Sequence, residues 1–376
     1  MQEERSYYFN NAKRIVVKLG SNLLTADDGL NIAAIRDITK QICFILNKEI
    51  EVIIVSSGAM AAGMKTLGFE KRPNETPKRQ AAAAVGQPQL MIEYQDAFRP
   101  YKKKVAQILL TSDGLSERKR YLNARNTLET ILSLKVIPII NENDTIAVKS
   151  IEFGDNDNLS AMISLLMDVD ILINLTDIDG LFNKDPRINS DAVMIKDVRT
   201  ITKDIAQAAS VIPGALGKGG MTSKIQAAKK LVSAGIPMVI ANGRHPDILI
   251  HIFSGKSYGT FFFPKDVRIN NRKRWLGYSI KPEGEIIIDK GAANAILKNG
   301  KSLLAGGIIG VKNHFTAGSP VSITSDNKKI ATGLSNYSSE DIHKIMGLKS
   351  CQIDQTLGHK ASDAIVHRNN MTIIYN

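Results

Sequence analysis

Short apolar runs alternate with longer amphipathic segments along the first 264 residues of the chain. The runs have the length of strands and end in glycine or polar residues, whereas the segments between them carry apolar residues at helical spacing. The predicted strands span 14–20, 51–55, 105–110, 136–140, 170–175, 237–241 and 259–263. The predicted helices span 32–46, 59–67, 77–99, 117–134, 158–167, 219–234 and 246–253. This alternation predicts an α/β domain, a three-layer αβα sandwich around a mostly parallel central sheet.

The pattern changes beyond residue 264. Residues 265–276 are polar and basic without periodicity, which indicates a linker. Short strands follow at 285–289, 308–311 and 321–324 and near residues 303 and 365, with helical spacing only at 292–298 and 339–346. We therefore expect a first domain over 1–264 and a small, mostly β, barrel-like domain over 277–376.

Polar residues follow several of the predicted strands. In open parallel sheets, ligands bind outside the carboxyl ends of the strands. Here those ends carry Lys18 and Gly20, the Ser56–Gly58 turn, the Asn141–Asp144 cluster, and Thr176 with Asp177. The sequence therefore predicts a functional site along one edge of the sheet.

The stretch from Asn141 to Asn158 is the most unusual part of that edge. Its two polar clusters, Asn141–Asp144 and Gly154–Asn158, separate a predicted buried strand from a predicted buried helix. Carboxylates and amides in such a place are costly unless they bind a ligand or each other. We expect a binding site there.

Three further turns have the composition of anion sites. Lys18 ends a predicted strand beside Gly20 and could reach phosphate oxygens, although a lysine extending from a strand end into solvent fits equally well. The Ser56–Ala59 turn enters a predicted helix and favours a bound anion, the alternative being an ordinary serine cap. The glycine-rich turn Gly217–Lys224 is the best candidate to wrap a triphosphate, and a flexible loop is its alternative.

The turn Thr176–Gly180, with Asn183–Arg187 after it, could hold a nucleotide's sugar, base or metal, or be a plain aspartate-rich turn. No G-x-G-x-x-G motif is present, and no histidine falls in these loops, which argues against Ser/His/Asp and Cys/His catalysis. Lysines, glycine turns and a carboxylate cluster on one edge suggest phosphoryl transfer, which relies on positioning and on charge stabilisation.

Composition narrows the class of protein. Hydrophobic residues make up 43% of the chain, enough for a large core, and the net charge of +12 suits anionic partners such as nucleotides or nucleic acid. A solvated lysine-rich surface would give the same charge. Cys43 and Cys351 are far apart, so neither a disulfide framework nor a zinc site is expected. Without a signal-like or membrane-length apolar segment, we expect a cytoplasmic protein.

Several motifs taken together resemble the amino acid kinase family, in the branch that phosphorylates glutamate. The resemblance covers nearly all of the first predicted domain in order, and residues 284–361 resemble a PUA domain. The motifs that carry it are Lys18–Ser21, Val55–Gly63, Tyr121–Arg125, Asn141–Asp144, Gly154–Ser160, Asp185–Arg187 and Gly219–Lys224.

The resemblance implies transfer of the γ-phosphoryl group of ATP to the side-chain carboxylate of L-glutamate. The product would be L-glutamyl 5-phosphate, the first intermediate of proline biosynthesis. Mg²⁺ would enter mainly on the ATP phosphates, without a metal site built from protein ligands. A carboxylate with a pKa of about 4.3 is already ionised at pH 7, so no general base is needed, which agrees with an active site that lacks histidine.

The resemblance also implies roles for individual residues. Lys18 and Lys224 would stabilise the phosphoryl oxygens, and Asp157 would hold both lysines. The residues implied for glutamate are Ser57, Gly58, Asp144 and Asn156. The residues implied for ATP are Lys18, Gly20, Thr176, Asp177, Lys218, Gly219, Gly220, Met221, Thr222, Ser223 and Lys224. Lys218 departs from the family, which often has threonine there. Residues 145–153 would form a flap over glutamate.

Partners and alternatives follow from the same resemblance. Relatives are inhibited by proline and form dimers or tetramers through the kinase domain, and coupling to glutamyl phosphate reductase is expected. A sibling kinase of the same fold, acting on N-acetylglutamate, aspartate, carbamate or a nucleoside monophosphate, is one alternative. An RNA-binding or RNA-modifying protein is another, although Trp275 and Tyr278 are isolated and form no aromatic platform for bases.

Overall fold

The computed structural model describes residues 2–26, 29–147, 155–211, 220–265 and 282–374. The chain divides into two compact units, one made of Met1–Leu115 and Lys119–Arg268, the other of Ser116–Arg118 and Ile269–Asn376. The predicted linker at 265–276 falls almost wholly outside the described residues. No helix in the described part of the chain is both long and apolar enough to span a membrane.

The first unit is built on an eight-stranded sheet in the order β10-β12-β11-β7-β1-β4-β6-β5. Its strands are β1 (Arg14–Leu19), β4 (Glu51–Val55), β5 (Lys104–Leu110), β6 (Val136–Glu142), β7 (Ile171–Thr176), β10 (Asp197–Val198), β11 (Met238–Asn242) and β12 (Thr260–Phe262). All neighbouring pairs are parallel except β11 with β12. Small two-stranded ribbons pair β2 (Thr25–Ala26) with β3 (Gly29–Leu30) and β8 (Leu181–Phe182) with β9 (Met194–Ile195).

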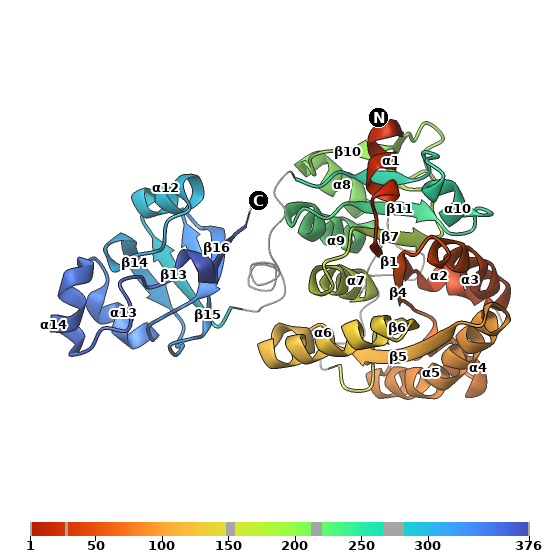
Figure 1. Cartoon of the computed structure of the whole chain (residues 1–376), viewed down its shortest axis with the longest axis horizontal. Helices are drawn as coiled ribbons and strands as arrows, with labels where there is room; N and C mark the ends of the chain where they lie inside the picture. Colours follow the sequence, from red (N-terminus) through yellow and green to blue (C-terminus); the bar gives the residue numbers. More distant parts are fainter. Residues whose placement is uncertain (1, 27–28, 148–154, 212–219, 266–281, 375–376) are drawn as a thin grey trace. The chain divides into compact units, whose positions relative to one another are not determined.

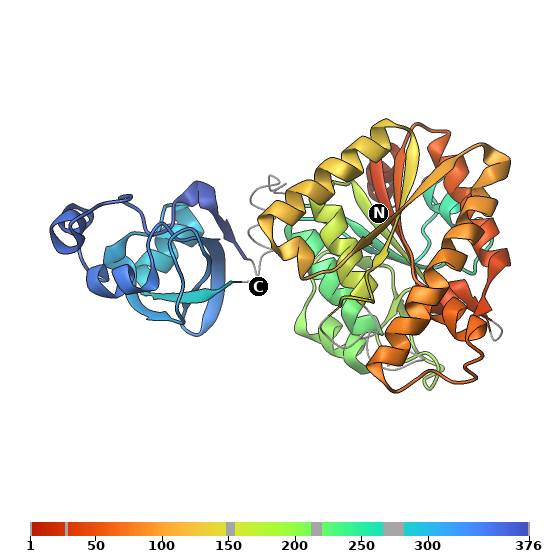
Figure 2. The same ribbon diagram turned by 90° about the horizontal axis from the view of Figure 1, so that it is seen from below.

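Helices cover both faces of this sheet (Figures 1 and 2). The helices of this unit are α1 (Gln2–Asn10), α2 (Ser21–Leu24), α3 (Ile32–Leu46), α4 (Ala59–Thr66), α5 (Thr76–Phe98), α6 (Arg118–Ser133), α7 (Asp155–Leu166), α8 (Lys203–Val211), α9 (Met221–Ser233) and α10 (Ile248–Phe253). Helices α3 and α10 lie on one face and α7 and α9 on the other (Figure 1). The predicted three-layer α/β sandwich is confirmed.

The period of two along β1 decides which side chains reach the functional edge. Ile15, Val17 and Leu19 belong to the core that α3, α5 and α10 cover. Because successive side chains of a strand point to opposite faces, Val16 and Lys18 face α7 and α9. The last residue of that second row is a lysine, placed in the buried layer close to the strand's carboxyl end.

The predicted elements of this unit agree with the observed ones to within three residues, and the missed elements are short or polar. Helices α1 and α8, of nine residues each, are the longest of these. The amphipathicity of α1 is weak, and tertiary contacts hold it: Arg5 Nε lies 2.8 Å from Asp197 Oδ1, and Phe9 packs against Phe261. Helix α5 runs without a break through Gly86 and Pro88.

The second unit contains a five-stranded sheet in the order β14-β13-β15-β16-β17. The strands are β13 (Gly284–Ile288), β14 (Ile308–Lys312), β15 (Pro320–Ser325), β16 (Lys328–Leu334) and β17 (Met371–Ile373). Helices α12 (Lys290–Asn299), α13 (Ser339–Ile345) and α14 (Ile353–Leu357) accompany them around a separate apolar core. This is the small β-rich unit that the sequence predicts, although β16, β17 and α14 were not predicted.

Helices α4 and α5 cross at two glycines. A Cβ atom on Gly63 would lie 1.7 Å from the carbonyl oxygen of Ala82, and one on Gly86 would lie 1.9 Å from that of Ala59. The two backbones therefore touch where no side chain fits. Because α4 begins directly after Ser57 and Gly58, this crossing also fixes the turn predicted to bind substrate.

We expect Gly86→Ala to destabilise the first unit by about 1–3 kcal/mol, because the added methyl group forces the two helices apart. Thermal or urea unfolding of the full chain measures the loss. Ala84→Leu is the matched control, since Ala84 is exposed on the same helix and should leave the unfolding midpoint nearly unchanged. Equal midpoints for wild type and Gly86→Ala would contradict the close crossing.

Candidate active site

Two lysines and one aspartate form a buried cluster at the carboxyl end of β1. Lys18 Nζ lies 2.6 Å from Asp157 Oδ1, and Lys224 Nζ lies 3.2 Å from Asp157 Oδ2. The three side chains are 5%, 11% and 1% exposed for Lys18, Lys224 and Asp157 in that order. The structure thus brings together the three residues predicted to be catalytic.

Three separate elements position this cluster. Lys18 is next to last in β1, Asp157 lies in the first turn of α7, and Lys224 lies in the first turn of α9. Helix α9 starts after Gly220, whose carbonyl accepts a hydrogen bond of 3.0 Å from Ser223 Oγ. Since α7 and α9 pack side by side over the sheet, their first turns meet above the end of β1.

Asp157 is saturated with hydrogen-bond donors. Besides the two lysines, Ser223 Oγ donates to Oδ2 at 2.5 Å and Asn174 Nδ2 donates to Oδ1 at 2.9 Å. Burial alone would raise the pKa of Asp157, but the charges of Lys18 and Lys224 outweigh it and hold that pKa well below its usual range. Asp157 is therefore a permanent anion that can neither carry a proton at neutral pH nor spare an oxygen for a metal ion.

The cluster has an excess of positive charge, because two lysines share one carboxylate. Burial lowers the pKa of Lys18, and the nearby charge of Lys224 lowers it further, whereas Asp157 and Asp177 act in the opposite direction. An additional anion beside Lys18 and Lys224 would relieve this imbalance. The arrangement is therefore suited to bind and stabilise a phosphoryl group.

The predicted nucleotide residues on β1 and β7 lie side by side. Gly20 N donates to Leu175 O at 2.9 Å, and a Cβ atom on Gly20 would come within 3.3 Å of that oxygen. Asp177 accepts from Asn22 Nδ2 at 2.9 Å and from Thr176 Oγ1 at 3.1 Å. Although partial burial raises the pKa of Asp177, these hydrogen bonds lower it overall. Asp177 is a fixed acceptor beside the lysine cluster.

The glycine-rich turn is described only from Gly220 onward. Lys218 and Gly219 lie outside the described residues, as does most of the predicted flap at 145–153. Met221 is buried and Thr222 is exposed at the start of α9, next to Ser223 and Lys224. The described part of the turn thus supplies two donors to Asp157.

Three of the predicted glutamate residues, Ser57, Gly58 and Asn156, meet at the turn that follows β4. Asn156 Nδ2 lies 3.0 Å from Ser57 Oγ, and Gly58 has φ of +105°, a left-handed conformation that lets the chain turn from β4 into α4. Burial and the charge of Arg79 lower the pKa of Arg72, and Asp144 lies close enough to that guanidinium for its charge to act in the opposite direction.

Three buried or partly buried amides at this edge were not predicted as site residues: Gln87, Asn174 and Asn22. Asn141 was predicted only as part of the Asn141–Asp144 cluster, without a role of its own. Asn174 is the one amide in the apolar strand β7, and this is a signal in the sequence that could have pointed to it, because a buried amide requires partners. Gln87 shares α5 with Gln80, Gln89 and Gln95, so the sequence does not distinguish it.

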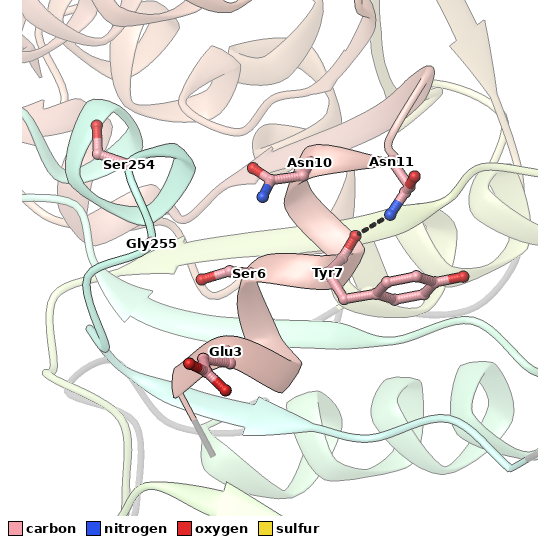
Figure 3. Close-up of a pocket in the computed structure, with 7 residues that line it drawn as sticks. All are labelled: Glu3, Ser6, Tyr7, Asn10, Asn11, Ser254 and Gly255. Atoms are coloured by element: carbon pink, nitrogen blue, oxygen red, sulfur yellow. Dashed lines mark hydrogen bonds between the residues drawn. The ribbon is translucent and has the colours of Figure 1, made fainter.

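A depression lies between α1 and the end of α10, away from the lysine cluster's residues (Figure 3). It is lined by Glu3, Ser6, Tyr7, Asn10, Asn11, Ser254 and Gly255. None of the predicted site residues lines it, and its described lining offers hydroxyls, amides and a carboxylate but no lysine or arginine. It does not fit a triphosphate.

We expect Asp157→Asn to reduce the free energy of unfolding by about 3–5 kcal/mol at pH 7, because it leaves buried lysines without their counter-ion. Urea unfolding measures this loss. Asp191→Asn removes the partner of an exposed ion pair with Lys184 and should leave the urea midpoint unchanged. A fully stable Asp157→Asn protein would show that the carboxylate does not compensate the lysines.

The stability difference between wild type and Asp157→Asn should depend on pH. A carboxyl with a depressed pKa stabilises the fold fully above its unfolded pKa of about 3.9 and loses that contribution as the pH falls toward its native pKa. The difference should therefore be constant from pH 7 to about pH 5 and shrink below about pH 4. A difference that widens in acid would reverse the assigned direction of the shift.

Comparison with known proteins agrees with this geometry. Residues 13–242 match the amino acid kinase family, and residues 284–357 match the PUA domain. A protein from Geobacter sulfurreducens named glutamate 5-kinase is 46% identical over 372 residues, 98% of this chain and 100% of that one. Proteins of the same name from Syntrophus aciditrophicus and Caldanaerobacter subterraneus are each 44% identical, over 100% and 96% of this chain and 97% and 98% of their own. The chain belongs to the amino acid kinase family.

Proposed function

We propose that this chain has glutamate 5-kinase activity: it transfers the γ-phosphoryl group of ATP to the side-chain carboxylate of L-glutamate. The products are L-glutamyl 5-phosphate and ADP, and the reaction is the first step of proline biosynthesis from glutamate. The buried cluster of Lys18, Asp157 and Lys224 is the observation that supports it. Full-length relatives that carry the name of this activity support it independently.

The reaction brings two anions together, and the positive charge of the cluster offsets the repulsion between them. The acceptor carboxylate is ionised at neutral pH and attacks without a general base. Its approach to the γ-phosphate requires positive charge around the transferring oxygens. Lys18 and Lys224 supply that charge, and Asp157 keeps both ammonium groups in place without itself exchanging a proton.

The two substrates occupy opposite sides of Lys18 in this proposal. ATP binds through Lys18, Gly20, Thr176, Asp177 and the turn that ends at Lys224, including Lys218 and Gly219. Glutamate binds through Ser57, Gly58, Asp144 and Asn156, and Asp144 pairs with its α-ammonium group. The strand order β7-β1-β4-β6 supports this division, because the two sets of residues follow strands on either side of β1.

Mg²⁺ enters the site on the phosphates of ATP and supplies additional positive charge there. The donor set of the chain favours this over a resident metal. The oxygens of Asp157 already accept from Lys18, Lys224, Ser223 and Asn174. Within residues 2–26, 29–147, 155–211, 220–265 and 282–374, no group of three or more His, Cys, Asp or Glu side chains could hold a metal ion.

Regulation and assembly extend the same proposal. Proline, an amino acid like the substrate, inhibits by competing for Ser57, Asp144 and Asn156. The chain forms a homodimer or homotetramer through its first domain and passes its labile acyl phosphate to glutamyl phosphate reductase in the cytoplasm. The catalytic domain spans 1–264, the linker 265–276, and the PUA-like domain 277–376, for which RNA is a candidate ligand.

Turnover with glutamate, ATP and Mg²⁺ in the presence of hydroxylamine tests the activity, because hydroxylamine traps an acyl phosphate as a hydroxamate, which forms a coloured complex with added Fe³⁺. We expect hydroxamate with L-glutamate only. N-acetylglutamate, aspartate, carbamate and nucleoside monophosphates serve as competing acceptors, with ADP release as the readout. Preference for one of these would reject the proposal in favour of a sibling kinase.

We expect Lys224→Ala to reduce kcat by at least about a hundredfold while the KM for glutamate changes less than about threefold, because Lys224 acts on the phosphoryl group during transfer. Lys229→Ala is the matched control, since Lys229 is exposed on the same helix. An increase in KM at unchanged kcat would remove Lys224 from the catalytic role.

A further inference from the structure

Three amide side chains form a continuous hydrogen-bonded chain beneath the proposed glutamate site. Asn141 Nδ2 on β6 donates to Gln87 Oε1 on α5 at 3.0 Å, and Asn156 Nδ2 on α7 donates to Asn141 Oδ1 at 3.1 Å. Gln87 and Asn141 are 8% and 3% exposed. Gln87 thereby connects a helix that supplies none of the predicted site residues to Asn156, which is one of them.

Backbone groups fix the direction of both asparagine amides. The carbonyl oxygen of Ser56 accepts from Asn156 Nδ2 at 2.9 Å, and a carbonyl oxygen cannot donate. The backbone N–H of Glu142 donates to Asn141 Oδ1 at 2.9 Å, and an N–H cannot accept. Exchanging the oxygen and nitrogen of either side chain would therefore place like groups against each other. The nitrogen of Asn141 must face Gln87, and the nitrogen of Asn156 must face Ser56.

This direction determines which group of Asn156 stays available. Its nitrogen is shared among Ser56 O, Ser57 Oγ and Asn141 Oδ1, whereas its buried Oδ1 has no hydrogen-bond partner among the described residues. A buried acceptor without a donor is costly, by about 1–3 kcal/mol. A ligand that brings a donor would remove this cost, and an alkylammonium group is a donor with no acceptor capacity.

The chain depends on an acceptor at position 87. Without one, the buried nitrogen of Asn141 has lost its partner, and rotating this side chain to find another would withdraw Oδ1 from Asn156. Asn156 would then lose an acceptor that keeps its nitrogen turned inward. Tyr94, two turns after Gln87 on α5, supports the same turn from the other side, since its hydroxyl lies 2.8 Å from Ser56 Oγ.

We propose that Gln87 is a positioning residue for substrate selection: through Asn141 it holds Asn156 with its carbonyl oxygen available to the α-ammonium group of an amino-acid substrate. This inference rests on the proposed function, because it assigns the ammonium group to glutamate. It concerns recognition of the ammonium group and leaves the phosphoryl chemistry at Lys18 and Lys224 unchanged. Gln87 touches no reacting atom, so its loss acts on KM rather than on kcat.

The test compares Gln87→Met with Gln87→Glu in the full-length chain. Methionine keeps the volume but offers no good acceptor, and we expect it to raise the KM for glutamate about tenfold with kcat and the KM for ATP nearly unchanged. The carboxylate that Gln87→Glu introduces still accepts a hydrogen bond from Asn141, so the KM for the substrate glutamate should stay within about threefold of wild type. Gln87→Leu, with a different packing shape, repeats the test if Gln87→Met does not fold.

Glutarate, which is glutamate without its ammonium group, separates recognition from general damage. Its inhibition constant against glutamate should stay the same in wild type and Gln87→Met, so that only the preference for the ammonium group falls. Parallel weakening of glutamate and glutarate, or an unchanged KM for glutamate, would overturn the proposal.

Gln41→Met is the matched control. Gln41 is also a buried glutamine on a helix of the same unit, and its Oε1 accepts from the backbone N–H of Leu249 at 2.8 Å, away from the site. It should lower the unfolding temperature without changing the KM for glutamate. A comparable rise in KM for Gln41→Met would mean that loosening of the unit explains the effect and would reject the role of Gln87. A wild-type chain that forms no hydroxamate would reject the proposed function itself.

Discussion

The paired contact of Lys18 and Lys224 with one buried carboxylate is the constraint on which the site depends. Two ammonium groups at 2.6 and 3.2 Å from the same aspartate leave one positive charge in excess in a place that solvent hardly reaches. Burying charge without full compensation is expensive, so the surrounding fold must hold the cluster together. Donors from Ser223 and Asn174 complete the shell of Asp157. An anionic ligand is the natural remaining partner of the cluster.

The strand order places the proposed sites for the nucleotide, the phosphoryl group and the acceptor next to one another around this cluster. Strand β1 lies between β7 and β4, and β6 follows β4. The residues after β7 suit a nucleotide, Lys18 at the end of β1 suits the transferring phosphoryl group, and the residues after β4 and β6 suit the acceptor. Parallel strands place all of these carboxyl ends at one edge. In this proposal, the topology of the sheet sets the direction in which the phosphoryl group moves, from the nucleotide side of β1 to the acceptor side.

Much of this frame can be predicted from the sequence, because apolar runs with period two or 3.6 specify strands and helices locally. The strand over 51–55 and the helix over 32–46 are predicted to the residue. Contacts between residues that are far apart in the sequence cannot be predicted in this way. Nothing near Gln87 in the chain indicates Asn141, and nothing near Asn174 indicates Asp157, since these contacts exist only once distant elements pack. Helix α1 was missed for the same reason, because Arg5 and Phe9 contact Asp197 and Phe261, which are far from them in the sequence.

Charge and amide direction perform different tasks at this edge. The lysine cluster attracts anions of many kinds, because a charge acts over distance and has little preference for shape. It cannot by itself distinguish an amino acid from a simple dicarboxylate. Asn156 is held by hydrogen bonds whose direction is fixed by the backbone at Ser56 and, through Asn141, at Glu142. The oxygen of such an amide accepts a hydrogen bond from a donor and repels another acceptor. It can therefore recognise the ammonium group that a dicarboxylate lacks. In the proposed mechanism, the charge that promotes transfer and the hydrogen-bond geometry that selects the substrate therefore belong to different groups, which meet at the neighbouring residues Asn156 and Asp157.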